Sequence, residues 1–273
     1  MKRVSNFLRR IWNRLYEDIT IIRKVKNCGS FLLAKLRRKP VRFIKLRNGA
    51  EITSPDEIDL NFLFHEIWIE RVYNPRGYEI KAGDTVIDIG GNIGMFAIFA
   101  ATREPAVKVF SFEPFPDNAA YFRKNLQQGN LKSITLSEKA VAANTGKRYL
   151  NVSETWISHS LGNTEQQRGG LEVDCTSLNE ILLTTGQCDL LKTDCEGSEY
   201  EILYATSTEN LKRIHKIVGE YHKRGENSGQ TLMQFLRNHS FRIDIFRELD
   251  ENIGMFCATN LNFAPALNNE AIK

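Results

Sequence analysis

The stretch Thr85-Val86-Ile87-Asp88-Ile89-Gly90-Gly91-Asn92-Ile93-Gly94 decides the fold that this sequence predicts. Residues 85–89 form a short apolar run rich in β-branched side chains, which is typical of a strand. A glycine-rich loop follows, and residues 95–102 have a composition compatible with a helix. Strand, glycine loop and helix in this order indicate the first unit of an α/β domain.

The same alternation continues along the chain. Helix starts are indicated by Asp117 as a cap and by the capping boxes Ser177 with Glu180 and Ser198 with Glu201. This alternation implies a mostly parallel sheet covered by helices on both faces, with ligands at the carboxyl ends of the strands. Further strands are predicted over residues 107–112, 134–141, 188–193, 214–220, 241–246 and 255–259.

The loop after the first strand favours a cofactor without a pyrophosphate. Glycines let the backbone approach a ligand closely, whereas the carboxylate of Asp88 would repel the phosphates of a dinucleotide. The spacing also departs from Gly-x-Gly-x-x-Gly, because Asn92 stands at the second glycine position and Gly94 comes one residue early. We therefore expect Asp88, Gly90, Gly91, Asn92 and Gly94 to bind a different cofactor.

Glu113 ends the second strand, 23 residues past Gly90. Folds of this kind place there an acid that accepts hydrogen bonds from both ribose hydroxyls. A nucleoside with a positive charge, S-adenosylmethionine, matches Asp88 and Glu113 together. Val141, after the third strand, would line the adenine. The alternatives are an exposed acid at a strand end for Glu113 and a buried strand end for Val141.

The composition is that of an ordinary globular protein, with 273 residues, 42% hydrophobic and 26% charged. The longest apolar run covers the seven residues 95–101, far short of the roughly 20 that cross a bilayer, so no transmembrane helix is expected. Charges interrupt the start of the chain, which argues against a secretory signal. Five scattered cysteines without a Cys-x-x-Cys pair indicate reduced thiols in a cytoplasmic protein.

Residues 1–39 are predicted to form a basic helical arm. Up to Arg47 the chain has 15 Lys and Arg against two acids, a net charge of +13, and the rest carries −9. Such a helix binds an anionic membrane surface or a polyanionic partner, or its apolar face packs on the domain behind it. Apolar residues recur there at three- and four-residue steps, namely Val4, Leu8, Ile11, Leu15, Ile19, Ile22 and Val25.

Residues 40–83 are predicted to lead from this arm into the main domain. Residues 41–46 and 50–53 flank Asn48-Gly49, which suits a tight hairpin turn. Helical spacing returns over residues 66–73. The main domain is expected over residues 84–260, followed by a polar tail over residues 261–273.

Three motifs together resemble the FkbM family of S-adenosylmethionine-dependent methyltransferases. They are residues 88–94, the triplet Phe112-Glu113-Pro114 and residues 190–203, in which Asp194-Cys195-Glu196-Gly197-Ser198-Glu199 is the most distinctive part. Residues 65–68 and Tyr73 are similar to the segment that leads into the family's domain.

This resemblance covers about residues 84–260 and implies a class I methyltransferase fold. That fold is a Rossmann-like, seven-stranded, mostly parallel sheet with its last strand antiparallel. The resemblance also implies S-adenosylmethionine as cofactor and O-methylation of a hydroxyl on a small molecule, such as a sugar, a glycan or another natural product. Thr193 and Cys195 stand where the family more often has other residues, but the main motif is intact.

Methyl transfer requires an acceptor oxygen held about 3 Å from the methyl carbon and a base that removes its proton. We predict His222 as the base, because its ordinary pKa of about 6.5 lets it accept a proton at neutral pH. Asp194 would form the wall of the methyl-transfer site and contact the cofactor, with Glu196 beside it. The alternatives are a solvated histidine and, for Glu196 and Glu199, acids that stabilise a helix terminus.

Asp194, Glu196, Glu220 and His222 offer ligands that suit magnesium, but sequence separation does not show that they converge, so no metal is assigned. The polar stretch 151–170 contains Trp156, which would either cover the acceptor or anchor its own loop.

Two other classes of function remain as alternatives. A nucleic-acid methyltransferase is disfavoured by the negative charge of the main domain, so no nucleic-acid partner is expected. A non-catalytic nucleotide-binding scaffold is disfavoured by the presence of Asp88, Glu113 and Asp194 together. A dehydrogenase is disfavoured by the glycine spacing.

Overall fold

The computed structural model describes residues 2–151, 160–162 and 170–263, with side chains described from Trp12 onward. Trp156 and most of the tail 261–273 therefore lie outside the described residues. All five cysteines lie inside them and are free thiols. Within this part of the chain, no helix combines the length and the apolar character needed to cross a membrane.

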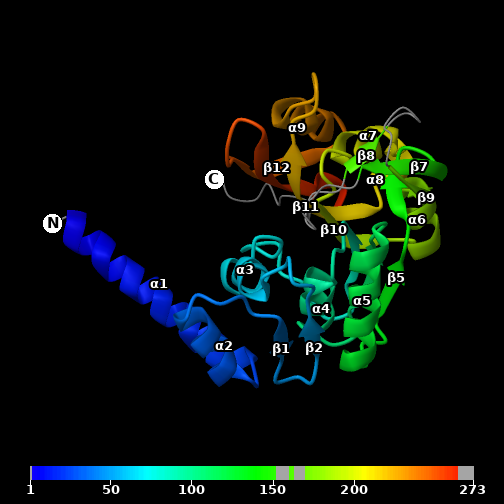
Figure 1. The fold of residues 1–273 in the computed structure, drawn as a ribbon. Helices are drawn as coiled ribbons and strands as arrows, with labels where there is room; N and C mark the ends of the chain where they lie inside the picture. The colour runs from blue at the N-terminus through cyan, green and yellow to red at the C-terminus, as the bar shows by residue number, and fades with distance from the viewer. Residues whose placement is uncertain (1, 152–159, 163–169, 264–273) are drawn as a thin grey trace.

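A seven-stranded sheet forms the centre of the molecule, in the order β12-β13-β11-β10-β3-β4-β5 (Figure 1). Strand β13 runs antiparallel between β11 and β12, and the other neighbouring pairs are parallel. This confirms the class I methyltransferase fold. The strands are β3 (Thr85–Ile89), β4 (Lys108–Phe112), β5 (Ile134–Ser137), β10 (Cys188–Thr193), β11 (Ile214–His222), β12 (Phe241–Glu248) and β13 (Ile253–Asn260).

Helices cover both faces of this sheet, as predicted. Because side chains alternate along a strand, Val86 belongs to the hydrophobic cluster on one face and Ile87 to the cluster on the other. The first cluster includes α4 (Met95–Ala101), and the second includes α6 (Leu178–Thr185), α7 (Glu199–Ala205), α8 (Thr208–Leu211) and α9 (Gly229–Asn238). Helix α5 (Pro116–Gly129) contributes Phe122 to the first cluster.

The single strand predicted over residues 134–141 is wrong, because it forms two strands in different sheets. Strand β5 ends at Ser137, the exposed pair Glu138 and Lys139 follows, and β6 (Ala140–Ala142) joins a second sheet. That four-stranded sheet has the order β6-β9-β7-β8, with β7 (Gly146–Asn151), β8 (Ser160–Gly162) and β9 (Leu171–Ser177). It brings Val141 to the carboxyl end of the main sheet.

Two of the three predicted helix caps are corrected. Ser177 does cap α6, since its hydroxyl accepts a hydrogen bond from the amide of Glu180 at 3.2 Å. Ser198 makes no capping bond before α7, because its backbone is already helical (φ −85°, ψ −5°). Asp117 lies within the first turn of α5, since Phe115 is the cap and Pro116 occupies the first helical position.

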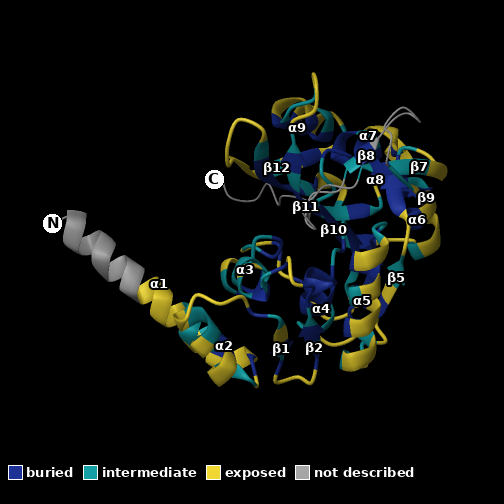
Figure 2. Cartoon of the chain, in the orientation of Figure 1, coloured by how far each residue is buried: buried dark blue, intermediate teal, exposed yellow. Residues whose placement is uncertain are grey.

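The arm and the lead-in contain α1 (Lys2–Lys24), α2 (Cys28–Leu36), the hairpin β1 (Phe43–Lys45) and β2 (Glu51–Thr53), and α3 (Leu60–Phe64). A π-helix, η1 (His65–Glu70), continues α3 directly, so the helix predicted over residues 66–73 begins earlier and ends earlier. A short 3-10 helix, η2 (Leu261–Phe263), follows β13. Figure 1 shows α1 extending away from the body, and Figure 2 shows that its described part is mostly exposed.

Candidate active site

A cavity of about 450 Å³ opens at the carboxyl ends of β3, β4, β10 and β11. Its volume lies within the range of about 300–1,000 Å³ that is usual for small-molecule sites. Its lining comes from the glycine loop after β3, the end of β4, β6, the ends of β10 and β11, and the helical lead-in. The topology therefore brings together the strand ends at which the sequence places its candidate residues.

The glycine loop forms one wall through Gly90, Gly91 and Asn92. Gly90 has φ +82°, and a Cβ there would lie 1.8 Å from the carbonyl oxygen of Asp194, so only glycine fits. Gly94 differs from its prediction, because it is not in the cavity lining. It has φ +89°, and a Cβ there would lie 2.3 Å from the ring of Phe122, so its role is packing at the start of α4.

Glu113 lines the cavity from the end of β4 and is only 5% exposed, so it is not a solvated acid at a strand end. Its Oε2 accepts a hydrogen bond from the amide of Asn92 at 2.7 Å, and Oε1 accepts one from the amide of Phe115 at 2.9 Å. Burial raises the pKa of Glu113 to about 7, although these two bonds oppose the shift. Each oxygen keeps further acceptor capacity for a ligand hydroxyl. Val141 of β6 also lines the cavity.

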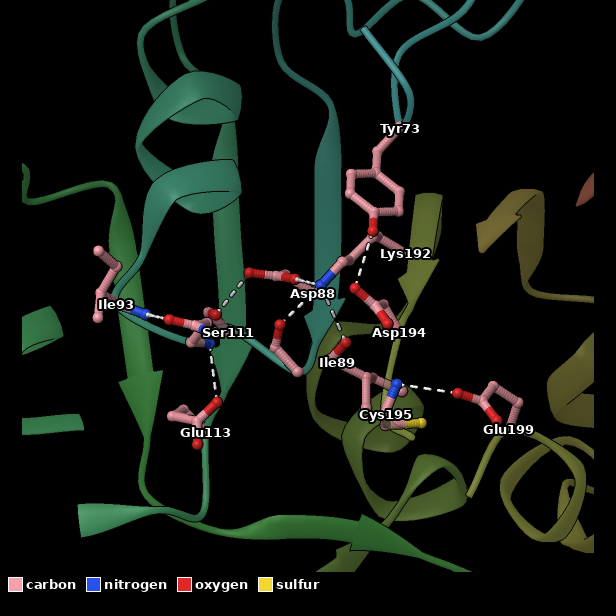
Figure 3. Close-up of polar contacts among 12 residues, drawn as sticks. Tyr73, Asp88, Ile89, Ile93, Ser111, Glu113, Lys192, Asp194, Cys195 and Glu199 are labelled. Atoms are coloured by element: carbon pink, nitrogen blue, oxygen red, sulfur yellow. Dashed lines mark hydrogen bonds and ion pairs between the residues drawn. The ribbon is translucent and has the colours of Figure 1, made fainter. Parts of the chain in front are cut away.

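Asp88 requires a correction, because it lies outside the cavity lining and is fully buried. Its Oδ1 lies 3.1 Å from Nζ of Lys192, and its Oδ2 accepts a hydrogen bond from the hydroxyl of Ser111 at 2.7 Å (Figure 3). The negative charge is therefore neutralised by Lys192 rather than by a cofactor. Asp88 acts below the site, where it fixes Lys192.

Lys192 itself lines the cavity, although its side chain is 4% exposed. Its Nζ donates a hydrogen bond to the carbonyl of Gly90 at 2.6 Å and lies 5.2 Å from the ring centre of Tyr73. Burial alone would lower the pKa of Lys192, but the carboxylates of Asp88 and Asp194 more than offset it, so the pKa is raised and Nζ is cationic.

The opposite side of the cavity is acidic. Asp194, Glu196, Glu220 and Glu66 all line it. Oδ2 of Asp194 accepts a hydrogen bond from the hydroxyl of Tyr73 at 2.8 Å, so the lead-in is tied to the end of β10 (Figure 3). Among these acids, burial raises the pKa of Glu66 and of Glu196.

Glu66 reaches this cavity from the π-helix η1. Burial raises its pKa to about 7, and the negative charges of Asp194 and Glu220 add to the shift. A carboxylate with this pKa is half ionised at neutral pH and can accept a proton there. π-Helical turns are frequent at functional sites, and this one is the element that positions the acid.

His222 lies among three carboxylates and is absent from the cavity lining. Its Nδ1 lies 3.3 Å from Glu199, and its Nε2 lies 3.2 Å from Glu220 and 3.4 Å from Glu196. Burial lowers the pKa of His222, but the hydrogen bonds to Glu199 and Glu220 and the charge of Glu196 outweigh it and raise the pKa to about 11. The imidazole is therefore protonated at neutral pH. This corrects its prediction as the general base.

Glu196 and Glu199 have different roles. Glu196 lines the cavity with a left-handed backbone (φ +55°), and burial raises its pKa to about 7 although His222 opposes the shift. Glu199 is fully buried, and its Oε1 accepts a hydrogen bond from the amide of Cys195 at 2.9 Å. Glu199 thus stabilises the loop after β10, which is a different contact from the helix-terminus role named as its alternative.

Among the described residues, Asp194, Glu220 and His222 bring one ligand atom each within 4.8 Å of one another. Three of the four residues that the sequence offered as ligands therefore converge, which sequence separation alone did not show.

Glu66, Tyr73 and Lys192 line the cavity but were not among the candidates from the sequence. Lys192 carried a detectable signal, because a lysine within the apolar run of β10 is rarely buried unless it is paired. For Glu66 and Tyr73, the only signal in the sequence was their position in the segment before the main domain. Their position over the cavity depends on how η1 packs against α4.

Comparisons with known proteins show which family this chain resembles. The methyltransferase FkbM domain family matches residues 88–243, which is more than half of the chain. The chain is 28% identical over 234 residues to the 31-O-demethyl-FK506 methyltransferase FkbM of Streptomyces tacrolimicus, covering 74% of this chain and 90% of that protein. It is 23% identical over 190 residues to methyltransferase 1 of Beauveria bassiana, covering 60% and 74%.

Among solved structures, the chain is similar to the methyltransferase domain of METTL16, with a TM-score of 0.48 and 16% identity, covering 78% of this chain and 74% of that one. The match of residues 88–243 includes the glycine loop, Glu113 and the acidic loop after β10. On this match, the chain belongs to the methyltransferase FkbM family.

Proposed function

We propose that this chain transfers the methyl group of S-adenosylmethionine to a hydroxyl oxygen of a small molecule, such as a sugar, a glycan or another natural product. The observation that carries this proposal is that Glu113 and Glu66 line the same cavity. One acid suits a ribose, and the other has a pKa at which it can remove a hydroxyl proton.

The residues present fit an adenosyl cofactor. Gly90 and Gly91 line the cavity with backbone alone, so a ligand can approach the loop closely, and Glu113 lines the same cavity with its carboxylate. Ala140 and Val141 supply a small apolar wall suited to an adenine. When bound, S-adenosylmethionine supplies a sulfonium-activated methyl group, which needs little activation beyond alignment with the acceptor.

Glu66 is the base in this proposal. It is preferred to Glu196, because the carboxylate of Glu196 already lies 3.4 Å from Nε2 of His222 and is held there. Asp194 is held by the hydroxyl of Tyr73, which fixes its orientation at the edge of the same cavity. Asp194 can therefore hold the acceptor hydroxyl or the cationic donor while Glu66 accepts the proton.

An oxygen acceptor is supported by one relative's name. The Streptomyces tacrolimicus protein is named for 31-O-demethyl-FK506, a natural product that lacks a methyl group on oxygen. The acidic lining also suits a neutral hydroxylated acceptor, because a phosphorylated one would be repelled by Asp194, Glu196 and Glu220.

The test has two stages. Calorimetric titration with S-adenosylmethionine should show binding, with S-adenosylhomocysteine as the product control. A panel of hydroxylated sugars and natural products is then incubated with methyl-labelled cofactor, and methylated product is analysed by mass spectrometry to locate the new methyl group. Absence of cofactor binding, or a methyl group located on nitrogen or carbon, would contradict the proposal.

A further inference from the structure

We propose that helix α1 binds the surface of an anionic lipid bilayer and lies in the plane of that surface. The contact is made by an apolar stripe on α1, which we define as Trp12, Leu15, Tyr16, Ile19 and Ile22. This inference is independent of the proposed reaction, because no residue of the stripe lines the cavity.

The stripe is a continuous face of exposed apolar side chains. Its members follow one another at three- and four-residue steps or are direct neighbours, so they lie on one side of the helix. Trp12 is 71% exposed and Leu15 is 51% exposed, and the other three are each 46–47% exposed. Figure 2 shows this part of α1 as a projecting, exposed element. An exposed apolar stripe of this size marks an interaction surface.

A different face of α1 attaches the helix to the protein. Ile21 is fully buried and lies away from the stripe on the helix circumference, and Val25, just after the helix, is fully buried and forms a β-bridge with Leu46. On the same side, Glu17 and Asp18 contact Nζ of Lys35 from α2 at 2.7 and 2.9 Å. The packing interpretation of this arm is therefore realised on one face, and the other face is the one that we propose for the bilayer surface. Packing against the body uses one face and leaves the stripe without a partner among the described residues.

Charge favours an anionic surface as the partner. Helix α1 contains seven basic and two acidic residues, and Lys35 already neutralises both acids. Arg14, Arg23 and Lys24 are exposed. Each basic residue near an anionic bilayer adds to the attraction. The remainder of the chain, after Arg47, is net negative, so the arm is the part that an anionic surface attracts.

The combination of both features identifies lipid rather than nucleic acid. A polyanion such as RNA would engage the basic side chains and leave the five stripe residues in water. A bilayer interface accepts both, because apolar side chains enter the acyl boundary while Trp and Tyr lie at the level of the headgroups.

The test uses the full chain and sedimentation with vesicles. Vesicles of phosphatidylcholine alone are compared with vesicles of phosphatidylcholine and phosphatidylglycerol in equal amounts. We expect the chain to sediment with the vesicles that contain phosphatidylglycerol and to remain mostly in solution with phosphatidylcholine alone.

The double variant Leu15→Ser with Ile19→Ser should weaken binding at least about tenfold, because it removes two apolar side chains that would be buried in the bilayer. The variant Arg23→Gln with Lys24→Gln should weaken binding to the anionic vesicles and reduce its dependence on salt.

The matched control is Leu183→Ser with Leu249→Ser, which removes two exposed leucines outside the arm. This control should bind as the unmodified chain does, and unfolding midpoints verify that every variant is folded. Equal binding by the stripe variant and the unmodified chain would overturn the proposal. Two further results would also overturn it if the chain does not bind vesicles. One is self-association that depends on the stripe, measured by sedimentation velocity. The other is binding to a labelled RNA.

Discussion

Nζ of Lys192 and Oδ1 of Asp88 lie 3.1 Å apart, and both side chains are buried beneath the cavity. Ser111 donates a hydrogen bond to the same carboxylate, and Lys192 also donates one to the carbonyl of Gly90. Asp88 lies on β3, Ser111 on β4 and Lys192 on β10. The ion pair therefore joins three central strands and fixes the start of the glycine loop.

Lys192→Met should destabilise the fold by about 3–5 kcal/mol, because it leaves Asp88 charged, buried and without its cation. The free energy of unfolding in urea measures this. The double variant Lys192→Met with Asp88→Asn should recover part of the loss, since no unpaired charge remains. Equal stability of the single variant and the unmodified chain would show that the pair does not hold these strands together.

Glu113→Gln should weaken the binding of S-adenosylmethionine by roughly 10- to 100-fold, because hydrogen bonds to a charged group contribute about 1.5–3 kcal/mol. Calorimetric titration gives the dissociation constant. Glu138→Gln is the control, because it removes an exposed acid that pairs with Arg123 outside the cavity. An unchanged dissociation constant in the Glu113 variant would exclude this acid as a cofactor contact.

Glu66→Gln should lower kcat by roughly 10²- to 10⁴-fold and leave the affinity for S-adenosylmethionine unchanged, because it removes the proposed proton acceptor. Single-turnover measurements with labelled cofactor separate the chemical step from binding. The control is Glu70→Gln on the same π-helix, which changes an exposed acid. Full turnover by the Glu66 variant would assign the base to another group.

Turnover should depend on pH through Glu66. With its pKa at about 7, Glu66 is protonated and inactive as a base below that pH, so kcat should fall about tenfold for each pH unit below 7 and reach a plateau above it. His222 stays protonated up to about pH 11 and contributes no step in this range. Measured at saturating cofactor, the step near pH 7 should be absent in the Glu66→Gln variant.

His222→Gln should destabilise the fold by about 3–5 kcal/mol at neutral pH, because it removes the cation between Glu196, Glu199 and Glu220. The pKa of His222 is raised from 6.5 to about 11, so its stabilisation is complete below pH 6.5 and is lost as the pH rises toward 11. Urea unfolding at several pH values gives the free energy of unfolding of the variant and of the unmodified chain. The difference between these two free energies should therefore shrink between pH 7 and pH 11. A difference that grows with pH would contradict a protonated His222.

The sequence by itself determined the architecture, because strands and helices depend mainly on local patterns. The run from Thr85 to Gly94 predicts a strand, a loop and a helix, and all three are present. The Asn48-Gly49 turn predicts the hairpin of β1 and β2, where Gly49 has φ +98°. Glu113 lies in the cavity lining because it follows β4, which runs parallel to β3, so the end of β4 lies beside the glycine loop that follows β3.

Only the tertiary structure decided which charged groups meet, and this set the roles of the site residues. Asp88 and Lys192 are 104 positions apart in the chain, and their pairing follows from the adjacency of β3 and β10. His222 is an ordinary base by type, yet Glu196 and Glu199 from the segment after β10, together with Glu220 on its own strand, raise its pKa so that it is protonated at neutral pH. Burial and neighbouring charge determine a pKa, and both are properties of residues distant in sequence. For the same reason, only the packing of α1 on α2 showed which side of the arm remains exposed.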